Sequence, residues 1–138
     1  MKAIIKPFVV MLGIIIGTAA ADSAIAADTV ATGGFTNVDM RTSGTWSLET
    51  RADGVYAVLA ADFKARKAPD LKIFLSKLPA SDVDGDNATD GVFVAELKSH
   101  KGAQAYKLPA GIDLAAFQSF VIHCQQYSKF WAAGDIRR

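Results

Sequence analysis

The chain has 138 residues, a formal net charge of +1 and a single cysteine. This length suffices for one domain with one hydrophobic core, and a single cysteine excludes any disulfide within the chain. Residues 27–138 carry 13 basic and 13 acidic side chains. A neutral chain without basic clusters gives no reason to expect a nucleic acid or an anionic membrane as a partner.

The N-terminus has the pattern of an export signal. Two lysines precede an apolar stretch of 15 residues from Pro7 to Ala21, and small residues follow up to Ala26. About 20 residues are needed to span a bilayer, so the stretch is short for a membrane helix. We predict a signal peptide over residues 1–26, with cleavage after Ala21 or an uncleaved N-terminal anchor as the alternatives. The mature protein is then expected to be periplasmic or secreted, without a membrane span.

Short strands are the predicted elements of the remaining chain. Residues 27–32 are small and polar, and we expect a flexible lead-in to a domain over residues 33–138. Trp46 and Leu48 alternate with polar neighbours, the pattern of a half-buried strand. Asp53-Gly54 then joins this strand to an apolar run over residues 55–59, which predicts a β-hairpin.

Four further strands are predicted, and turn residues separate them. They lie at Leu71–Ser76, Val92–Leu97, Ala103–Leu108 and Phe120–Gln126. An acidic stretch over residues 81–91 interrupts them, and Asp113 is placed to cap a helical turn over residues 114–117. Many short strands at close spacing predict an all-β fold, a single-domain antiparallel β-sandwich or barrel-like sandwich.

Cys124 is the candidate site residue. Strand alternation places Phe120, Ile122 and Cys124 on one face, and Val121 and His123 on the other. The face with the thiol is the more apolar one, which favours a buried and chemically inert cysteine. His123 is then expected on the outer sheet face as an ordinary polar residue. An unpaired thiol in an exported protein also suits redox chemistry or an intermolecular disulfide.

Metal and haem sites find little support. His100, His123, Cys124 and Met40 match the ligand types of a blue-copper site, but neither His nor Met follows Cys124 on the same loop. Neighbouring strand residues also point to opposite faces, so His123 and Cys124 cannot share an ion without a bulge. Covalent c-type haem needs a second cysteine and is excluded. No metal site and no cofactor is therefore predicted.

The acidic segment Asp82–Asn87 has carboxylates at alternate positions, as calcium loops do. An EF-hand would need Gly in place of Asn87 and Glu in place of Phe93. The segment is expected to be a solvated turn, with weak calcium binding left open. No motif of a classical hydrolase occurs, so a redox or binding module is favoured over a classical enzyme.

Three motifs in order resemble the DM-thirteen domain family, named electron-transfer DM. The family pattern runs roughly G-P-D-L-x-V-x-L-S, L-K-x-x-x-G-x-Q-x-Y-x-L-P and V-V-I-W-C-x-x-F. The matching segments are Ala68–Ser76, Leu97–Pro109 and Phe120–Tyr127. The resemblance extends over about residues 33–136.

The resemblance implies a mostly β domain with a redox role through the cysteine that Cys124 matches. Three positions depart from the pattern: Ala68 replaces a Gly, His123 replaces the Trp before the cysteine, and Gly134 stands where Ala is usual. The sequence thus supports an exported redox module that acts through Cys124, with an unidentified redox or protein partner. The alternative is a non-catalytic β-domain that binds a protein or matrix partner and keeps Cys124 in its core.

Overall fold

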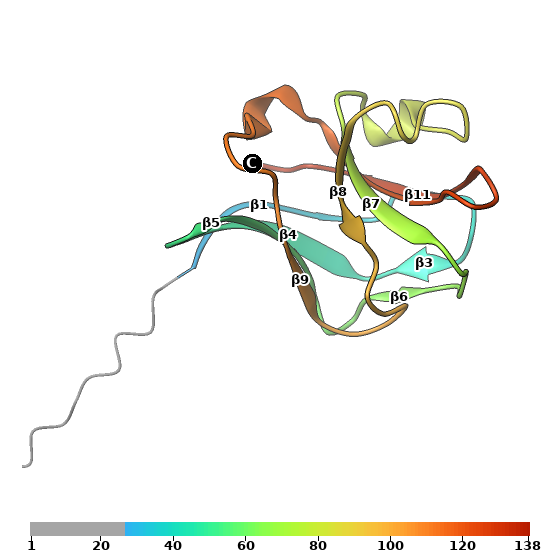
Figure 1. Ribbon diagram of the computed structural model, residues 1–138, viewed down its shortest axis with the longest axis horizontal. Coiled ribbons are helices and arrows are strands. Elements are labelled where there is room, and N and C mark those ends of the chain that lie inside the picture. Colours follow the sequence, from blue (N-terminus) through green and yellow to red (C-terminus); the bar gives the residue numbers. More distant parts are fainter. Residues whose placement is uncertain (1–26) are drawn as a thin grey trace, which may run out of the picture.

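Two antiparallel sheets form the fold in the computed structural model, which describes residues 27–138 (Figure 1). The predicted signal peptide over residues 1–26 lies outside the described residues. The first sheet has the order β1-β4-β5-β9 and the second the order β2-β11-β10-β7-β8, while β3 and β6 form a separate two-stranded ribbon. The strands are β1 (Asp28–Gly34), β2 (Asn37–Val38), β3 (Thr42–Ser43), β4 (Thr45–Arg51), β5 (Gly54–Leu59), β6 (Lys64–Ala65), β7 (Leu71–Ser76), β8 (Val92–Glu96), β9 (Gln104–Lys107), β10 (Ser119–Cys124) and β11 (Lys129–Asp135).

The predicted β-sandwich is confirmed, and the expected strands lie within a residue or two of their predicted bounds. The hairpin between β4 and β5 turns at Ala52-Asp53, one residue earlier than predicted, because Arg51 pairs with Gly54. Asp113 caps the 3₁₀ turn η2 (Leu114–Ala116) as predicted, and its Oδ1 accepts a hydrogen bond from the amide of Ala115 at 3.1 Å.

The expected flexible lead-in over residues 27–32 is wrong. Residues Asp28–Gly34 form β1, which pairs with β4 along its whole length, from Asp28 opposite Thr50 to Gly34 opposite Thr45. The pairing is made by backbone groups, so a run of small polar residues forms an edge strand without an apolar side-chain pattern.

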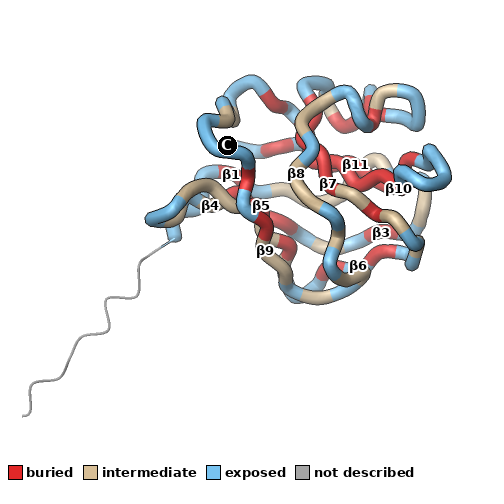
Figure 2. Tube along the Cα trace, in the orientation of Figure 1, coloured by how far each residue is buried: buried red, intermediate tan, exposed pale blue. Residues whose placement is uncertain are grey.

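Between the two sheets lies the main hydrophobic core (Figure 2). Trp46 of the first sheet stacks on Phe120 of the second, with ring centroids 4.8 Å apart. Leu48 and Leu59 approach from the first sheet, and Ile73 and Ile122 from the second; all four are fully buried. Alternate residues of each strand thus supply one continuous core, as expected for a sandwich.

A second, smaller core covers the outer face of the second sheet. Its members are buried under the segment between β7 and β8: Phe74, Ala80, Val83, Ala88, Val121, Phe130 and Ala133. The segment contains the 3₁₀ turn η1 (Ala80–Asp82) and lies above β7 and β11 (Figure 1). The side chain of Asn37 attaches this segment to the sheet: its Nδ2 donates to the carbonyls of Ala80 and Val83 at 2.9 and 2.8 Å.

This cover corrects the expectation for His123. The residue does point to the outer face, but it is only 3% exposed, and its ring lies edge-on to Phe74 with centroids 6.5 Å apart. Its Nδ1 has no hydrogen-bond partner among the described residues. Burial lowers the pKa of His123 below its usual value, because a dry site disfavours the charged imidazolium.

Gly134 provides a test of the close approach between β11 and the end of β1. A Cβ at Gly134 would lie 1.7 Å from the carbonyl oxygen of Gly34. We therefore expect Gly134→Ala to lower the free energy of unfolding by about 2–3 kcal/mol. Gly85→Ala, whose Cβ would meet its nearest atom at 3.9 Å, is the control and should change stability little. Urea denaturation of both variants measures this, and equal stabilities would contradict it.

The buried imidazole of His123 predicts a pH-dependent stability. The folded protein keeps His123 neutral, whereas the unfolded chain binds a proton as the pH falls below the ordinary value of 6.5. The contribution of neutral, buried His123 to the free energy of unfolding is therefore fully present above that value. The contribution decreases as the pH falls from that value toward the lowered pKa of the folded state. Denaturant titrations at about pH 5.5 and about pH 7.5 should show a smaller loss in His123→Gln than in the wild type. His100→Gln should retain the wild-type loss, and an unchanged loss in His123→Gln would contradict the assignment.

Candidate functional site

Cys124 is the last residue of β10 and is fully buried. It lies in the register opposite Leu71 of β7 and Lys129 of β11. As predicted from strand alternation, Phe120, Ile122 and Cys124 belong to the core between the sheets, while Val121 belongs to the outer core. Solvent does not reach the free thiol in this structure.

A short exposed turn, Gln125–Ser128, follows the buried cysteine. Two contacts attach Gln125 to the strand beside it: its amide donates to the carbonyl of Asp70 at 3.1 Å, and its Oε1 accepts from Lys72 Nζ at 2.7 Å. Ser128 has φ of +46°, a left-handed conformation that non-glycine residues seldom adopt. An exposed turn with a residue in a left-handed conformation thus follows Cys124 directly in the chain.

Trp131 connects the core around Cys124 with the surface. It is the extra residue of a β-bulge, since Ile122 pairs with Ala132 and His123 with Phe130. The Trp131 ring is buried in the same core as Cys124, and its Nε1 donates to the carbonyl of Arg66 at 3.0 Å. Trp131 also lines a shallow pocket of about 440 Å³ beside Met40 and Tyr127.

The four candidate copper ligands are not brought together. Cys124 faces the inner core and His123 the outer one, while His100 and Met40 line a separate pocket at the β3–β6 ribbon. Among residues 27–138 there is no group of three or more His, Cys, Asp or Glu side chains that could hold a metal ion. The bulge in β11 leaves His123 and Cys124 on opposite faces of β10.

The acidic segment uses its side chains to build its own turn. Asp84 Oδ1 accepts hydrogen bonds from the amides of Asp86 and Asn87, at 2.9 and 3.3 Å. The side chain of Asn87 makes two further hydrogen bonds: its Oδ1 accepts from the amide of Asp84, and its Nδ2 donates to the carbonyl of Asp82. The carboxylates are exposed, whereas Val83 and Ala88 of the same segment are buried beneath them.

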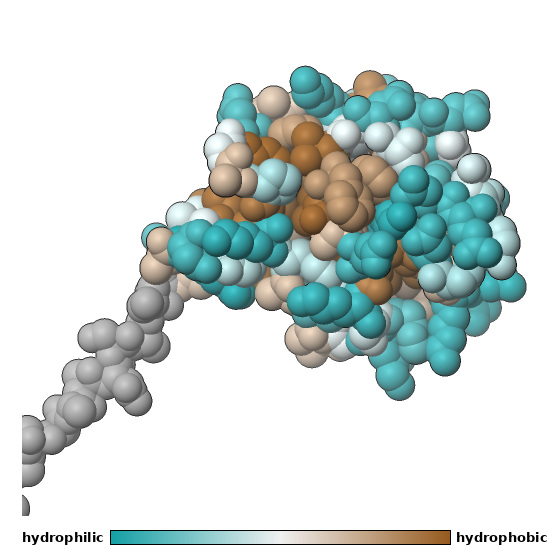
Figure 3. Space-filling view, viewed as in Figure 1, coloured by the Kyte–Doolittle hydropathy of each residue, from teal (hydrophilic) through white to brown (hydrophobic). Residues whose placement is uncertain are grey.

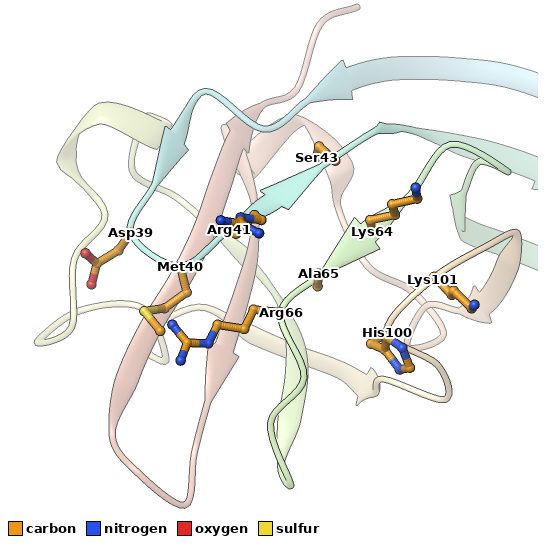
Figure 4. Close-up of a pocket in the computed structure, with 9 residues that line it drawn as sticks. All are labelled: Asp39, Met40, Arg41, Ser43, Lys64, Ala65, Arg66, His100 and Lys101. Atoms are coloured by element: carbon orange, nitrogen blue, oxygen red, sulfur yellow. The ribbon is translucent and has the colours of Figure 1, made fainter.

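A basic pocket is the feature that sequence reasoning missed. Arg41, Lys64, Arg66 and Lys101 line one pocket of about 670 Å³, together with Met40 and His100 among others (Figure 4). The expectation of a chain without basic clusters is therefore wrong for the folded molecule. Lys64 and Arg66 form an alternating basic pair in the sequence, but Arg41 and Lys101 join it only through strand pairing.

No helix among the described residues is long and apolar enough to cross a bilayer. Figure 3 shows hydrophobic side chains gathered on one face around the C-terminus and β8, while the region of β3 and β6 is largely hydrophilic.

Comparison with known proteins agrees with the order of motifs along the strands. No curated protein and no solved structure matches the chain. The model of the family described as electron transfer DM13, the DM-thirteen family that the motifs resemble, matches residues 34–135. That range runs from the last residue of β1 to the last residue of β11 and includes Cys124. The chain is therefore a member of the electron transfer DM13 family.

Proposed function

We propose that this chain is an exported electron-transfer module in which Cys124 is the redox group. Membership of the DM13 family supports the electron-transfer role. The observation that carries the assignment to Cys124 is its place at the end of a buried strand, next to the exposed turn Gln125–Ser128. Opening this one turn, without unfolding the sandwich, would bring the sulfur to a partner.

Export is supported by the position of the folded domain relative to the predicted cleavage site. β1 begins at Asp28, two residues after Ala26. A cut after Ala26 thus leaves every described strand whole, whereas a cut after Ala21 would leave a longer tail. Both products would contain the complete matched range, residues 34–135.

The chemistry open to a single cysteine is limited. With no second thiol in the chain, the sulfur must form its bond with another molecule. In a disulfide exchange, the Cys124 thiolate attacks one sulfur of a partner disulfide, and the other sulfur leaves as a thiolate. One S–S bond breaks, one forms, and the product is a mixed disulfide between the two proteins.

Complete burial of the sulfur favours a second candidate function. A cysteine in an apolar core without a hydrogen-bond partner is typically structural and inert. The chain would then be a non-catalytic β-domain that binds a protein or matrix partner, and Cys124 would fill space in the core. The two functions differ in how the thiol becomes accessible.

Thiol labelling separates the two functions. If the turn opens locally, 5,5′-dithiobis(2-nitrobenzoate) should modify Cys124 in the native protein faster than global unfolding allows. If labelling required global unfolding, its rate would equal the labelling rate of the unfolded chain multiplied by the equilibrium constant for unfolding. We expect the labelling rate of the native protein to exceed that product by at least about tenfold. Labelling that follows global unfolding alone would overturn the redox proposal and leave the core role.

Loosening the turn should raise the labelling rate further. Gln125→Ala removes the contact with Lys72 Nζ, a charged hydrogen bond worth about 1.5 kcal/mol, so we expect labelling about tenfold faster. Gln126→Ala, an exposed neighbour in the same turn, is the matched control and should label at the wild-type rate. Equal rates in the two variants would show that this turn does not control access.

Cys124→Ser and Cys124→Ala provide the companion test. A core role predicts that Ser is the less stable of the two by about 1–3 kcal/mol, because a buried hydroxyl has no partner at this position. A redox role predicts that both variants also lose mixed-disulfide formation. Chemical denaturation and intact mass after incubation with a disulfide measure the two effects separately.

A further inference from the structure

The β3–β6 ribbon builds a pocket that no part of the electron-transfer proposal uses. Thr42 pairs with Ala65 and Ser43 with Lys64, and Lys64 also forms a bridge with Lys101. The amide of Arg66 donates to the carbonyl of Arg41 at 2.7 Å, which extends the same register by one residue. Three chain segments that are distant in sequence thus meet at one backbone platform (Figure 4).

Strand register sets the cations of this platform opposite one another. Thr42 and Ala65 are buried, whereas Arg41, Lys64, Arg66 and Lys101 are exposed, so the charged side chains share the solvent side. Arg41 lies opposite Arg66, and Lys64 opposite Lys101. Like charges directly opposite each other destabilise a sheet. Two such pairs in one pocket therefore work against folding.

No acidic side chain among the residues that the structure describes pairs with the four cations. None of them takes part in an ion pair within residues 27–138. Asp39 also lines the pocket, but its carboxylate pairs with Lys129, and the nearby Asp62 accepts from the amide and hydroxyl of Thr45. The pocket therefore keeps a net positive charge, although the described chain as a whole is neutral.

We propose that this pocket binds a small molecule with at least two anionic groups, phosphate or carboxylate. The volume of the pocket, about 670 Å³, lies in the range that is usual for sites that bind small molecules. Lys64 and Arg66 are two residues apart on one strand, so the two cation pairs are spaced by about 6–7 Å along it. Each pair would bind one anionic group, with Arg41 and Arg66 supplying planar guanidinium donors.

The distribution of charge favours a compact anion over a long polyanion. The acidic segment Asp82–Asp90 lies over the outer face of the second sheet, and none of its carboxylates lines the pocket at β3 and β6. An extended nucleic acid needs a basic stripe across a face, whereas the positive charge here is concentrated in one pocket. The ligand class is thus a small molecule with two or more anionic groups, about the size of citrate or tripolyphosphate.

Calorimetric titration of the purified protein at low ionic strength tests the proposal. Citrate and tripolyphosphate should each bind one site saturably, and the tighter of the two identifies carboxylate or phosphate as the preferred group. Acetate and orthophosphate, which cannot reach both cation pairs, should bind at least about tenfold more weakly. No saturable binding of either probe at millimolar concentration, or equal affinity for the single-group anions, would overturn the proposal.

Paired substitutions locate the site. Arg41→Gln/Arg66→Gln and Lys64→Gln/Lys101→Gln should each weaken binding of the tighter probe by about tenfold or more. Lys77→Gln/Lys107→Gln removes the same charge outside the pocket and should leave the affinity nearly unchanged. Equal weakening in this control would mean that net charge alone attracts the anion, which contradicts a built site.

Thermal unfolding of the same variants shows whether their weaker binding comes from a loss of stability. Both pocket variants should melt at or above the wild-type temperature, because each removes one pair of opposed like charges. Lower melting temperatures for both would contradict the idea that the charges are kept at a cost to stability. These outcomes do not depend on Cys124, so the redox proposal can fail while the anion site stands.

Discussion

Burial of β10 on both faces is the constraint on which the rest of the structure depends. All six residues of this strand are buried, from Ser119 to Cys124. The inner face packs against the first sheet through the stack of Phe120 on Trp46, and the outer face lies under the segment between β7 and β8. A central strand without a solvent face tolerates no shift of register, because any slip would exchange the two cores. The position of the cysteine is fixed by the same packing.

That packing gives Cys124 an environment unlike that of an exposed thiol. Its neighbours in the register are Leu71 and Lys129, and the exposed turn Gln125–Ser128 follows it directly in the chain. Burial protects this thiol from oxidants in solution, and under the redox role proposed above its reactivity would depend on how often the turn opens. Trp131 extends the same core to the surface near Met40 and Tyr127, and the shallow pocket there shares Met40 and Arg66 with the basic pocket.

Most of the fold could be predicted from the sequence, because the relevant signals are local. Alternation around Trp46 and the Asp53-Gly54 turn located one hairpin, and the apolar run Phe120–Cys124 located the central strand. Among the strands longer than two residues, β1 and β11 were missed because β1 is small and polar, and because Ala132, Ala133 and Gly134 give little strand signal. The burial of His123 was missed because the cover over it comes from a segment about forty residues earlier, whose acidic residues suggest solvent exposure. The basic pocket depends on pairing between three distant segments, which no local pattern contains.

The uneven distribution of charge has a consequence for the behaviour of the protein in solution. An acidic segment over the outer face of the second sheet and a cationic pocket at the β3–β6 ribbon give residues 27–138, which carry no net charge, a permanent dipole moment. A dipole of this kind exerts no long-range net attraction, but it turns the molecule as it approaches a charged body. Near a negatively charged surface, the protein would present the ribbon first and hold the acidic segment away. Encounter is then biased toward one orientation before any specific contact forms.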